Sequence, residues 1–179
     1  MNLEEEAKLN FNSGYNCAES VSLVVSKQLG RMKQSSISCV PRMATGFGGG
    51  VARNGDICGA LAGGIMAISL ALGRDKPGQS RDPCYDATDR FYNEFVEAFG
   101  SSKCCELTGL DLKRPEQRET YQSRIHVERC NPIVAWSAKR AYEIIRKPRG
   151  SERPLGLITQ QKRSVKHKSL RAHVRAGIA

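Results

Sequence analysis

The chain has 179 residues, which is enough for one compact domain. Its hydrophobic fraction of 40% with only 6% aromatic residues is typical of a small helical protein. The net charge is +10, but residues 1–145 hold 18 Lys and Arg against 17 Asp and Glu, so most of the excess lies in residues 146–179. Seven cysteines, an odd number, argue against a fully paired disulfide framework.

The N-terminal region predicts three helices. Apolar residues on one side favour a helix over residues 3–12. Asn16, followed three residues later by Glu19, resembles a capping box, so a second helix is expected over residues 17–29. A third helical stretch is predicted over residues 36–44.

A glycine-rich loop, Gly46 to Gly50, precedes the motif Cys58-Gly59-Ala60-Leu61-Ala62-Gly63. We expect Asp56 to cap a central helix that ends at Gly73. The charge-free stretch 57–73 is shorter than the roughly 20 residues that span a bilayer. It therefore predicts a helix buried on all sides, with no membrane insertion.

The C-terminal half predicts two strong helices and weaker elements between them. Asp82-Pro83 is a good start for a helix that ends at Gly100. Ser101 or Ser102 is expected to cap a short turn through Cys104, and residues 110–119 to form a loop or a frayed helix. Asn131-Pro132 starts the last helix, which reaches Ile145.

The sequence contains no convincing alternating pattern of the kind that predicts strands. The predicted class is therefore all-α: a compact bundle of five to six helices over residues 1–146, followed by a disordered basic tail over residues 147–179.

Four cysteines fall at four predicted helix starts: Cys17, Cys58, Cys104 and Cys130. The first N–H groups of a helix lack partners within it, and the dipole places partial positive charge there. If these helix starts converge, the four thiols share an electropositive pocket, and the pKa of Cys58 falls from about 8.5 into the neutral range.

Several separated segments carry a further signal: Gly14-Tyr15-Asn16-Cys17-Ala18-Glu19-Ser20-Val21, the glycine loop, Cys58 to Gly63, Phe99-Gly100-Ser101 before Cys104, Glu106 to Leu112, and Cys130 with the helix after it. In this order, over residues 3–145, they resemble the family of small redox-active proteins labelled C-GCAxxG-C-C. The resemblance implies redox activity through Cys17, Cys58, Cys104 and Cys130, with no defined substrate or partner. A similar module occurs in split-Soret-type cytochromes, where an iron–sulfur centre has been suspected.

Three functions remain open. In the first, Cys58 is the attacking thiol of a thiol–disulfide or electron-transfer protein, and one of the other three cysteines resolves the mixed disulfide. In the second, the same four thiolates hold an iron–sulfur cluster; such sites usually include a close Cys-x₂₋₄-Cys pair, which this chain lacks. In the third, the chain is a binding module whose basic tail contacts acidic partners. Buried cysteines that only fill the core are the structural alternative.

The remaining predictions concern single residues and surroundings. Cys39, Cys84 and Cys105 have no assigned role, and His126, four residues before Cys130, is either a base or ligand or a solvated side chain. The acidic N-terminus contains no apolar signal segment, so a cytoplasmic location is predicted. The redox partner and homo-oligomerisation stay open, and nucleic acid is expected to make only non-specific contacts with the tail.

Overall fold

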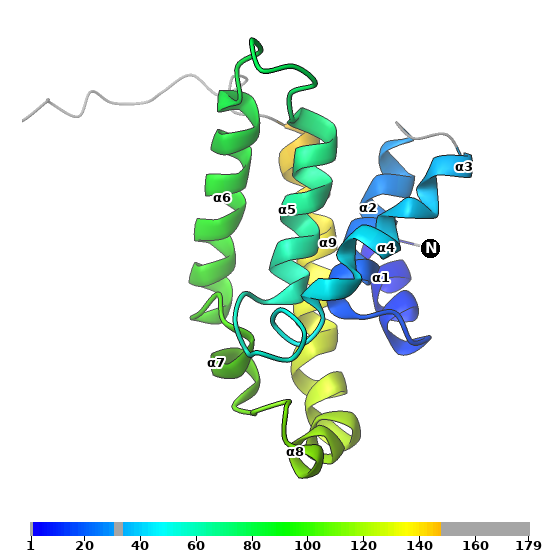
Figure 1. The fold of residues 1–179 in the computed structure, drawn as a ribbon, viewed down its shortest axis with the longest axis vertical. Coiled ribbons are helices and arrows are strands. Elements are labelled where there is room, and N and C mark those ends of the chain that lie inside the picture. Colours follow the sequence, from blue (N-terminus) through cyan, green and yellow to red (C-terminus); the bar gives the residue numbers. More distant parts are fainter. Residues whose placement is uncertain (1, 31–33, 148–179) are drawn as a thin grey trace, which may run out of the picture.

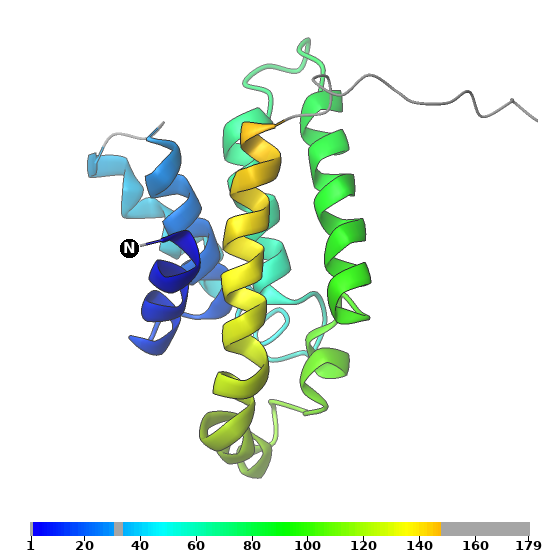
Figure 2. The same cartoon turned by 180° about the vertical axis from the view of Figure 1, so that it is seen from behind.

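The computed structural model describes residues 2–30 and 34–147, and these residues form an all-α structure, which confirms the predicted class (Figure 1). Two long helices lie at the centre, α5 (Gly59–Leu72) and α9 (Asn131–Arg146). On one side lies α6 (Asp82–Phe99), and on the other lie α1 (Leu3–Asn12) and α2 (Cys17–Leu29), as both views show (Figure 2). The shorter elements are α3 (Gln34–Ile37), α4 (Cys39–Ala44), the 3-10 turn η1 (Thr45–Phe47), α7 (Cys104–Thr108), α8 (Pro115–Thr120) and the π-helix η2 (Tyr121–Cys130).

The start of α2 is fixed by the capping box that the sequence predicts. Asn16 Oδ1 accepts hydrogen bonds from the N–H groups of Ala18 and Glu19 at 2.9 and 3.0 Å. Glu19 Oε2 in return accepts from the N–H group of Asn16 at 2.7 Å. Both hydrogen bonds of the capping box are present, so Cys17 is held at the first position of the helix.

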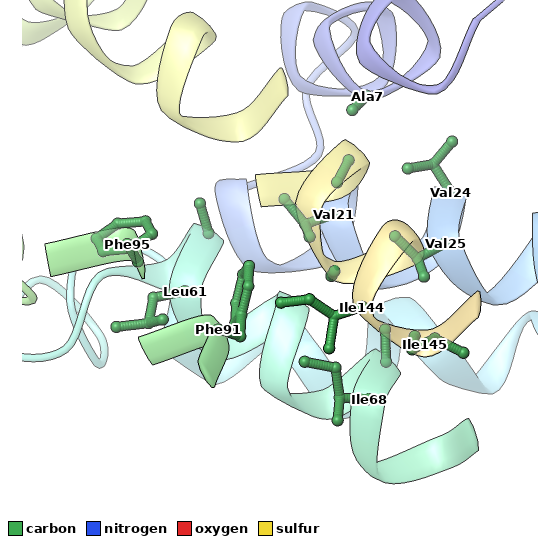
Figure 3. Packing of buried hydrophobic residues seen from close by; sticks show 14 of the residues in the cluster. Ala7, Val21, Val24, Val25, Leu61, Ile68, Phe91, Phe95, Ile144 and Ile145 are labelled. Carbon is green, nitrogen blue, oxygen red and sulfur yellow. The ribbon is translucent and has the colours of Figure 1, made fainter. Parts of the chain in front are cut away.

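The main core lies between α2, α5, α6 and α9, where aliphatic and aromatic side chains interlock (Figure 3). Phe91, Phe95, Leu61, Ile68 and Ile144 are almost completely removed from solvent. Each such side chain contributes on the order of 1.5–3 kcal/mol of burial free energy. Cys58 and Cys84 belong to the same buried cluster, so the thiol site is continuous with the core.

Small residues let α5 approach its neighbours closely. A Cβ atom at Gly63 would lie 2.4 Å from the carbonyl oxygen of Ala18 in α2, and one at Gly64 would lie 2.4 Å from the ring of Phe91 in α6. The central helix is thus buried on most sides rather than on all of them as predicted, since Leu70 near its end is exposed. Within residues 2–30 and 34–147, none of the helices has both the length and the apolar character of a membrane span.

One predicted helix start is wrong. The helix after the glycine loop begins at Gly59 with Cys58 as its N-cap residue, and Asp56 is exposed two residues earlier. The last α-helix begins at Asn131 with Pro132 in its first turn, as predicted, but it continues directly from a π-helix that the sequence does not indicate. Proline has no N–H group to donate, and the change from π- to α-helix falls at Asn131, beside Pro132.

Other boundaries differ in smaller ways. The helical stretch over residues 36–44 is divided at Ser38 into α3 and α4. Of the two alternatives for residues 110–119, a loop or a frayed helix, the second half takes the helical one and forms α8. The last helix ends at Arg146, and from residue 148 onward the predicted basic tail lies outside the described residues.

Candidate functional site

The four cysteines singled out by the sequence line one cavity. This inner cavity has a volume of about 20 Å³, roughly the space of one water molecule, and lies at the end of the bundle where the glycine loop meets α7. Its walls also contain Tyr121 and apolar side chains such as Leu112 and Ile133. Residues more than 100 positions apart in the chain therefore line the same cavity.

Each cysteine reaches the cavity from a different element. Cys17 is the first residue of α2, Cys58 is the N-cap residue of α5, and Cys104 is the first residue of α7. Cys130 is the last residue of η2, inside a continuous helical segment, and the next N–H group, of Asn131, is bonded to the carbonyl of His126. All four cysteines lie at the starts of α-helices as predicted, with Cys130 as the N-cap residue of α9, but the N–H group after Cys130 is already bonded within the preceding π-helix.

Backbone hydrogen bonds tie two of these positions together. The N–H group of Cys58 donates to the carbonyl of Ser102 at 2.7 Å, and that of Cys104 donates to the carbonyl of Asp56 at 2.7 Å. Ile57 and Lys103 form an antiparallel bridge between them. No serine side chain caps α7: its N-cap residue is Lys103, whose N–H group donates to the Ser101 hydroxyl at 3.0 Å.

The glycine of the Cys-Gly-Ala motif is explained by a close approach to sulfur. A Cβ atom at Gly59 would lie 2.4 Å from Cys17 Sγ and 2.9 Å from the carbonyl oxygen of Phe47. A Cβ atom at Gly50 would lie 2.6 Å from Cys104 Cβ. Glycine at these places lets the loop and α5 close over the thiols.

The glycine loop continues into a run of left-handed backbone. Gly49 and Gly50 have positive φ, and so do Val51, Ala52 and Arg53, at 58°, 50° and 67°. A non-glycine residue in this region costs on the order of 1–2 kcal/mol, and a β-branched residue such as Val51 is a rare occupant. Hydrogen bonds across the loop hold the run, among them Ala52 N–H to the carbonyl of Gly46 at 2.9 Å. Strain of this kind concentrates at functional sites.

Burial raises the pKa of all four thiols. Burial and the charge of Cys17 raise the pKa of Cys58 to about 12, and the same two causes raise the pKa of Cys104 and Cys130 to about 12. The prediction that Cys58 is a thiol of low pKa is therefore wrong. The N–H groups of Ala60 and Leu61 at the helix start do lower the pKa of Cys58, but the loss of hydration on burial raises it by more.

Cys17 differs from the other three in its backbone surroundings. Burial raises its pKa as well, but four backbone N–H groups oppose this: those of Gly49, Ala18, Ala60 and Cys17 itself. Such a nest of N–H groups favours a negative charge on the sulfur. A charge on Cys17 would in turn raise the pKa of each of the other three.

Tyr121 is a member of the site that the sequence does not indicate. A hydrogen bond from Tyr121 lowers the pKa of Cys130, while burial and the nearby cysteines raise the pKa of Tyr121 itself well above its usual value. Tyr121 is the first residue of η2 and Cys130 the last. The residue lies in a polar stretch with no motif, so only the three-dimensional arrangement reveals it.

A larger outer pocket of about 670 Å³ adjoins the inner cavity. Cys17, Gly49, Leu112 and Tyr121 line both spaces, and Cys17 is the only one of the four cavity cysteines that lines the outer pocket. His126 also lines it, with its ring stacked on Phe11 at 4.0 Å between centroids. His126 is half-buried rather than solvated, and burial lowers its pKa, so its ring is neutral at pH 7.

The remaining cysteines lie outside this cavity. Cys39 and Cys105 are exposed, and Cys84 is buried in the main core with its sulfur 3.7 Å from the Ser69 hydroxyl. Cys84 also follows a helix start, so the helix-start criterion alone does not separate it from the cavity cysteines.

The four thiols match an iron–sulfur cluster in number and chemical type, but the space between them does not. A volume of about 20 Å³ accommodates a water molecule and not a cluster. Within residues 2–30 and 34–147, no group of three or more His, Cys, Asp or Glu side chains is arranged to hold a metal ion.

Comparisons with known proteins agree with the resemblance seen in the sequence. The profile of the family described as "Putative redox-active protein (C_GCAxxG_C_C)" matches residues 15–144. An uncharacterised protein of Archaeoglobus fulgidus is 34% identical over 116 residues, which cover 60% of this chain and 75% of that relative. No solved structure matches the chain significantly.

Proposed function

Because the chain belongs to the C_GCAxxG_C_C family of putative redox-active proteins, we propose that its clustered cysteines perform thiol–disulfide exchange, with Cys17 as the thiol that meets the substrate. The observation that carries this proposal is the position of Cys17, which lines both the outer pocket and the inner cavity. A substrate in the outer pocket can reach Cys17, and the three other thiols lie behind it.

The exchange begins at Cys17. After losing its proton, the Cys17 sulfur attacks one sulfur of a substrate disulfide, forms a mixed disulfide and releases the other half of the substrate as a thiolate, which takes up the proton. The N–H groups of Gly49, Ala18 and Ala60 stabilise the Cys17 thiolate before the attack.

A second cysteine completes the reaction. Cys58, Cys104 or Cys130 attacks Cys17 Sγ, forms an internal disulfide and releases the second half of the substrate as a thiol. The dithiol is oxidised to a disulfide while the substrate disulfide is reduced to two thiols, so electrons and protons balance. Burial favours the neutral forms, protonated thiols before the step and a disulfide after it, over a charged thiolate. The resolving thiol therefore gives up its proton to the departing substrate sulfur as it attacks.

The neighbouring groups have positioning roles in this proposal. Tyr121 holds Cys130 through its hydrogen bond, and the bridge between Ile57 and Lys103 keeps Cys58 beside Cys104. We propose no step through an iron–sulfur cluster, because the inner cavity is too small. The binding role of the basic tail remains a prediction.

The test counts and maps thiols. Reduced protein, kept free of oxygen, is treated with diamide, and free thiols are labelled and located by peptide mass spectrometry. We expect a loss of two free thiols, one at Cys17 and one at Cys58, Cys104 or Cys130. Cys17→Ser should abolish this loss, whereas Cys39→Ser, which removes an exposed thiol outside the cavity, should preserve it.

Two outcomes would contradict the proposal. Either the lost thiols map to the exposed Cys39 and Cys105, or Cys17→Ser still forms the same internal disulfide at the wild-type rate. Iron and acid-labile sulfide in stoichiometric amounts in protein purified without oxygen would instead support the cluster hypothesis.

A further inference from the structure

The outer pocket has a distinctive charge. It is lined by Arg53 and Arg118, and within the described parts of the chain no Asp or Glu side chain lines it. The ring of His126 adds no charge at neutral pH, because burial lowers its pKa. The pocket is therefore positive through two guanidinium groups.

Neither guanidinium is neutralised by a carboxylate among the described residues. Arg118 Nη1 donates to the carbonyl oxygens of Leu112 and Lys113 at 3.2 and 2.9 Å, which leaves its charge uncompensated. The Arg53 guanidinium forms no hydrogen bond or ion pair with residues 2–30 or 34–147. By contrast, Arg140 on the bundle is bonded to two carboxylates, Glu94 and Glu143.

The backbone aims Arg53 at the pocket at an energetic cost. Arg53 ends the left-handed run, with φ of 67°, and its side chain packs where Gly49 has no Cβ atom. A planar guanidinium is suited to bidentate binding of a carboxylate or phosphate. A volume of about 670 Å³ falls within the range of small-molecule sites.

We infer that the outer pocket selects a low-molecular-weight disulfide or thiol bearing carboxylates, which Arg53 and Arg118 bind while its sulfur faces Cys17. This inference rests on the proposed function and adds the chemical class of its substrate. The exchange itself is unchanged: Cys17 displaces one substrate thiolate, and an inner cysteine displaces the other.

Three matched disulfides test the inference. Dithiodipropionate, hydroxyethyl disulfide and cystamine have similar length and carry negative, neutral and positive ends. We measure the rate of disulfide formation in the reduced protein with each of them at low and at high salt. We expect dithiodipropionate to react at least about tenfold faster than cystamine at low salt, and the difference to shrink at high salt.

Substitution of each arginine tests which side chain favours the negatively charged disulfide. Arg53→Gln is expected to slow the reaction with dithiodipropionate about fivefold to tenfold, while the rate with hydroxyethyl disulfide stays within about twofold of that of the wild type. Arg42→Gln is the matched control, because Arg42 is exposed on α4 and does not line the pocket. Arg118→Gln should act like Arg53→Gln, with circular dichroism to verify that the loss of its two backbone bonds leaves the fold intact.

A dicarboxylate without sulfur separates this inference from the proposed function. Suberate has the length of dithiodipropionate, and its binding is measured by calorimetry in wild type and Arg53→Gln. Binding of suberate without exchange of any disulfide would sink the proposed function and support the anion pocket. Exchange at equal rates with all three disulfides, without suberate binding, would overturn the anion pocket alone. Absence of both binding and exchange would overturn both.

Discussion

The two ends of the bundle differ in the regularity of their backbone. Around Ile68, Phe91 and Ile144 the backbone is regular α-helix, and stability comes from apolar side chains that interlock. At the end with the four cysteines the chain contains a left-handed run, an antiparallel bridge and a π-helix. Cysteine behaves differently in each place: Cys84 fills the core, whereas Cys17 meets three other thiols. The comparison teaches that irregular backbone, rather than the residue type alone, makes a thiol cluster.

The largest expected effect comes from adding a methyl group at Gly59, where α5 comes very close to Cys17. Gly59→Ala places a Cβ atom 2.4 Å from Cys17 Sγ and 2.9 Å from a backbone oxygen, so the loop or α5 must shift. We expect the free energy of unfolding to fall by about 2–3 kcal/mol in urea denaturation. Gly46→Ala has open space around the new atom and should change it by less than about 0.5 kcal/mol. Equal stability of the two variants would show that α5 does not close on Cys17.

The next effect concerns proton release from the thiols. Burial raises the pKa of Cys17 above 9.0 and that of Cys58, Cys104 and Cys130 to about 12, so the reduced cluster stays protonated below those values. Oxidation to a disulfide then releases two protons with two electrons. We expect the midpoint potential to fall by about 59 mV per pH unit from about pH 6 to about pH 9. A shallower slope within that range would mean that one of the reacting thiols is already ionised.

A smaller effect is expected in the regular half. Glu94 on α6 accepts from Arg140 Nη2 on α9 at 2.8 Å, from Arg140 Nε, and from Arg90 Nε at 3.0 Å. Glu94→Gln should cost about 1–2 kcal/mol at pH 7, against almost nothing for Glu97→Gln, an exposed position on the same helix.

The pH dependence of that cost follows from the ionisation of Glu94. The hydrogen bond from Arg140 holds the pKa of Glu94 below its usual range. The contribution of the ion pair is therefore complete above the pKa of the unfolded chain, about 4.3, and is lost as the pH falls through the lower pKa of the folded state. The difference between wild type and Glu94→Gln should shrink below about pH 4; a constant difference would contradict this account.

The smallest effect compares the same substitution in both regions. Ala52→Gly relieves a φ of 50° and should raise the free energy of unfolding by about 0.5–1 kcal/mol. Ala98→Gly lies at an exposed position of the regular helix α6 and should lower it by about 1 kcal/mol. A gain in stability for Ala52→Gly with a loss for Ala98→Gly would confirm the backbone strain beside the four cysteines. A loss of stability in both variants would disprove it.

The helices could be predicted from the sequence because their signals are local. The capping box of Asn16 and Glu19 fixes a helix start through neighbours in the chain, and the charge-free motif after Cys58 indicates a buried helix. The four cysteines could be selected because they recur at helix starts and in the family pattern.

The backbone conformation and burial at the end with the four cysteines could not be predicted, because they depend on contacts that the local sequence does not reveal. The left-handed φ of Val51 is imposed by hydrogen bonds across the loop, against the preference of the residue. The π-helix lies in a polar stretch whose pattern favours no helix face, so the sequence indicates neither Tyr121 nor the helical turns that precede Cys130. The low pKa expected for Cys58 is wrong, because helix dipoles can be inferred from sequence but the burial that outweighs them cannot.

The bridge at the thiol end has a consequence for chain connectivity. The covalent connection between α5 and α6 runs through the exposed residues 73–80 at the opposite end of the molecule, as Figure 1 shows. The bonds from Cys58 to Ser102 and from Cys104 to Asp56 fasten the same two parts of the chain where the thiols lie. The distant connection can therefore lengthen by insertion, or be cut, while the spacing of Cys58 and Cys104 stays under the control of the bridge.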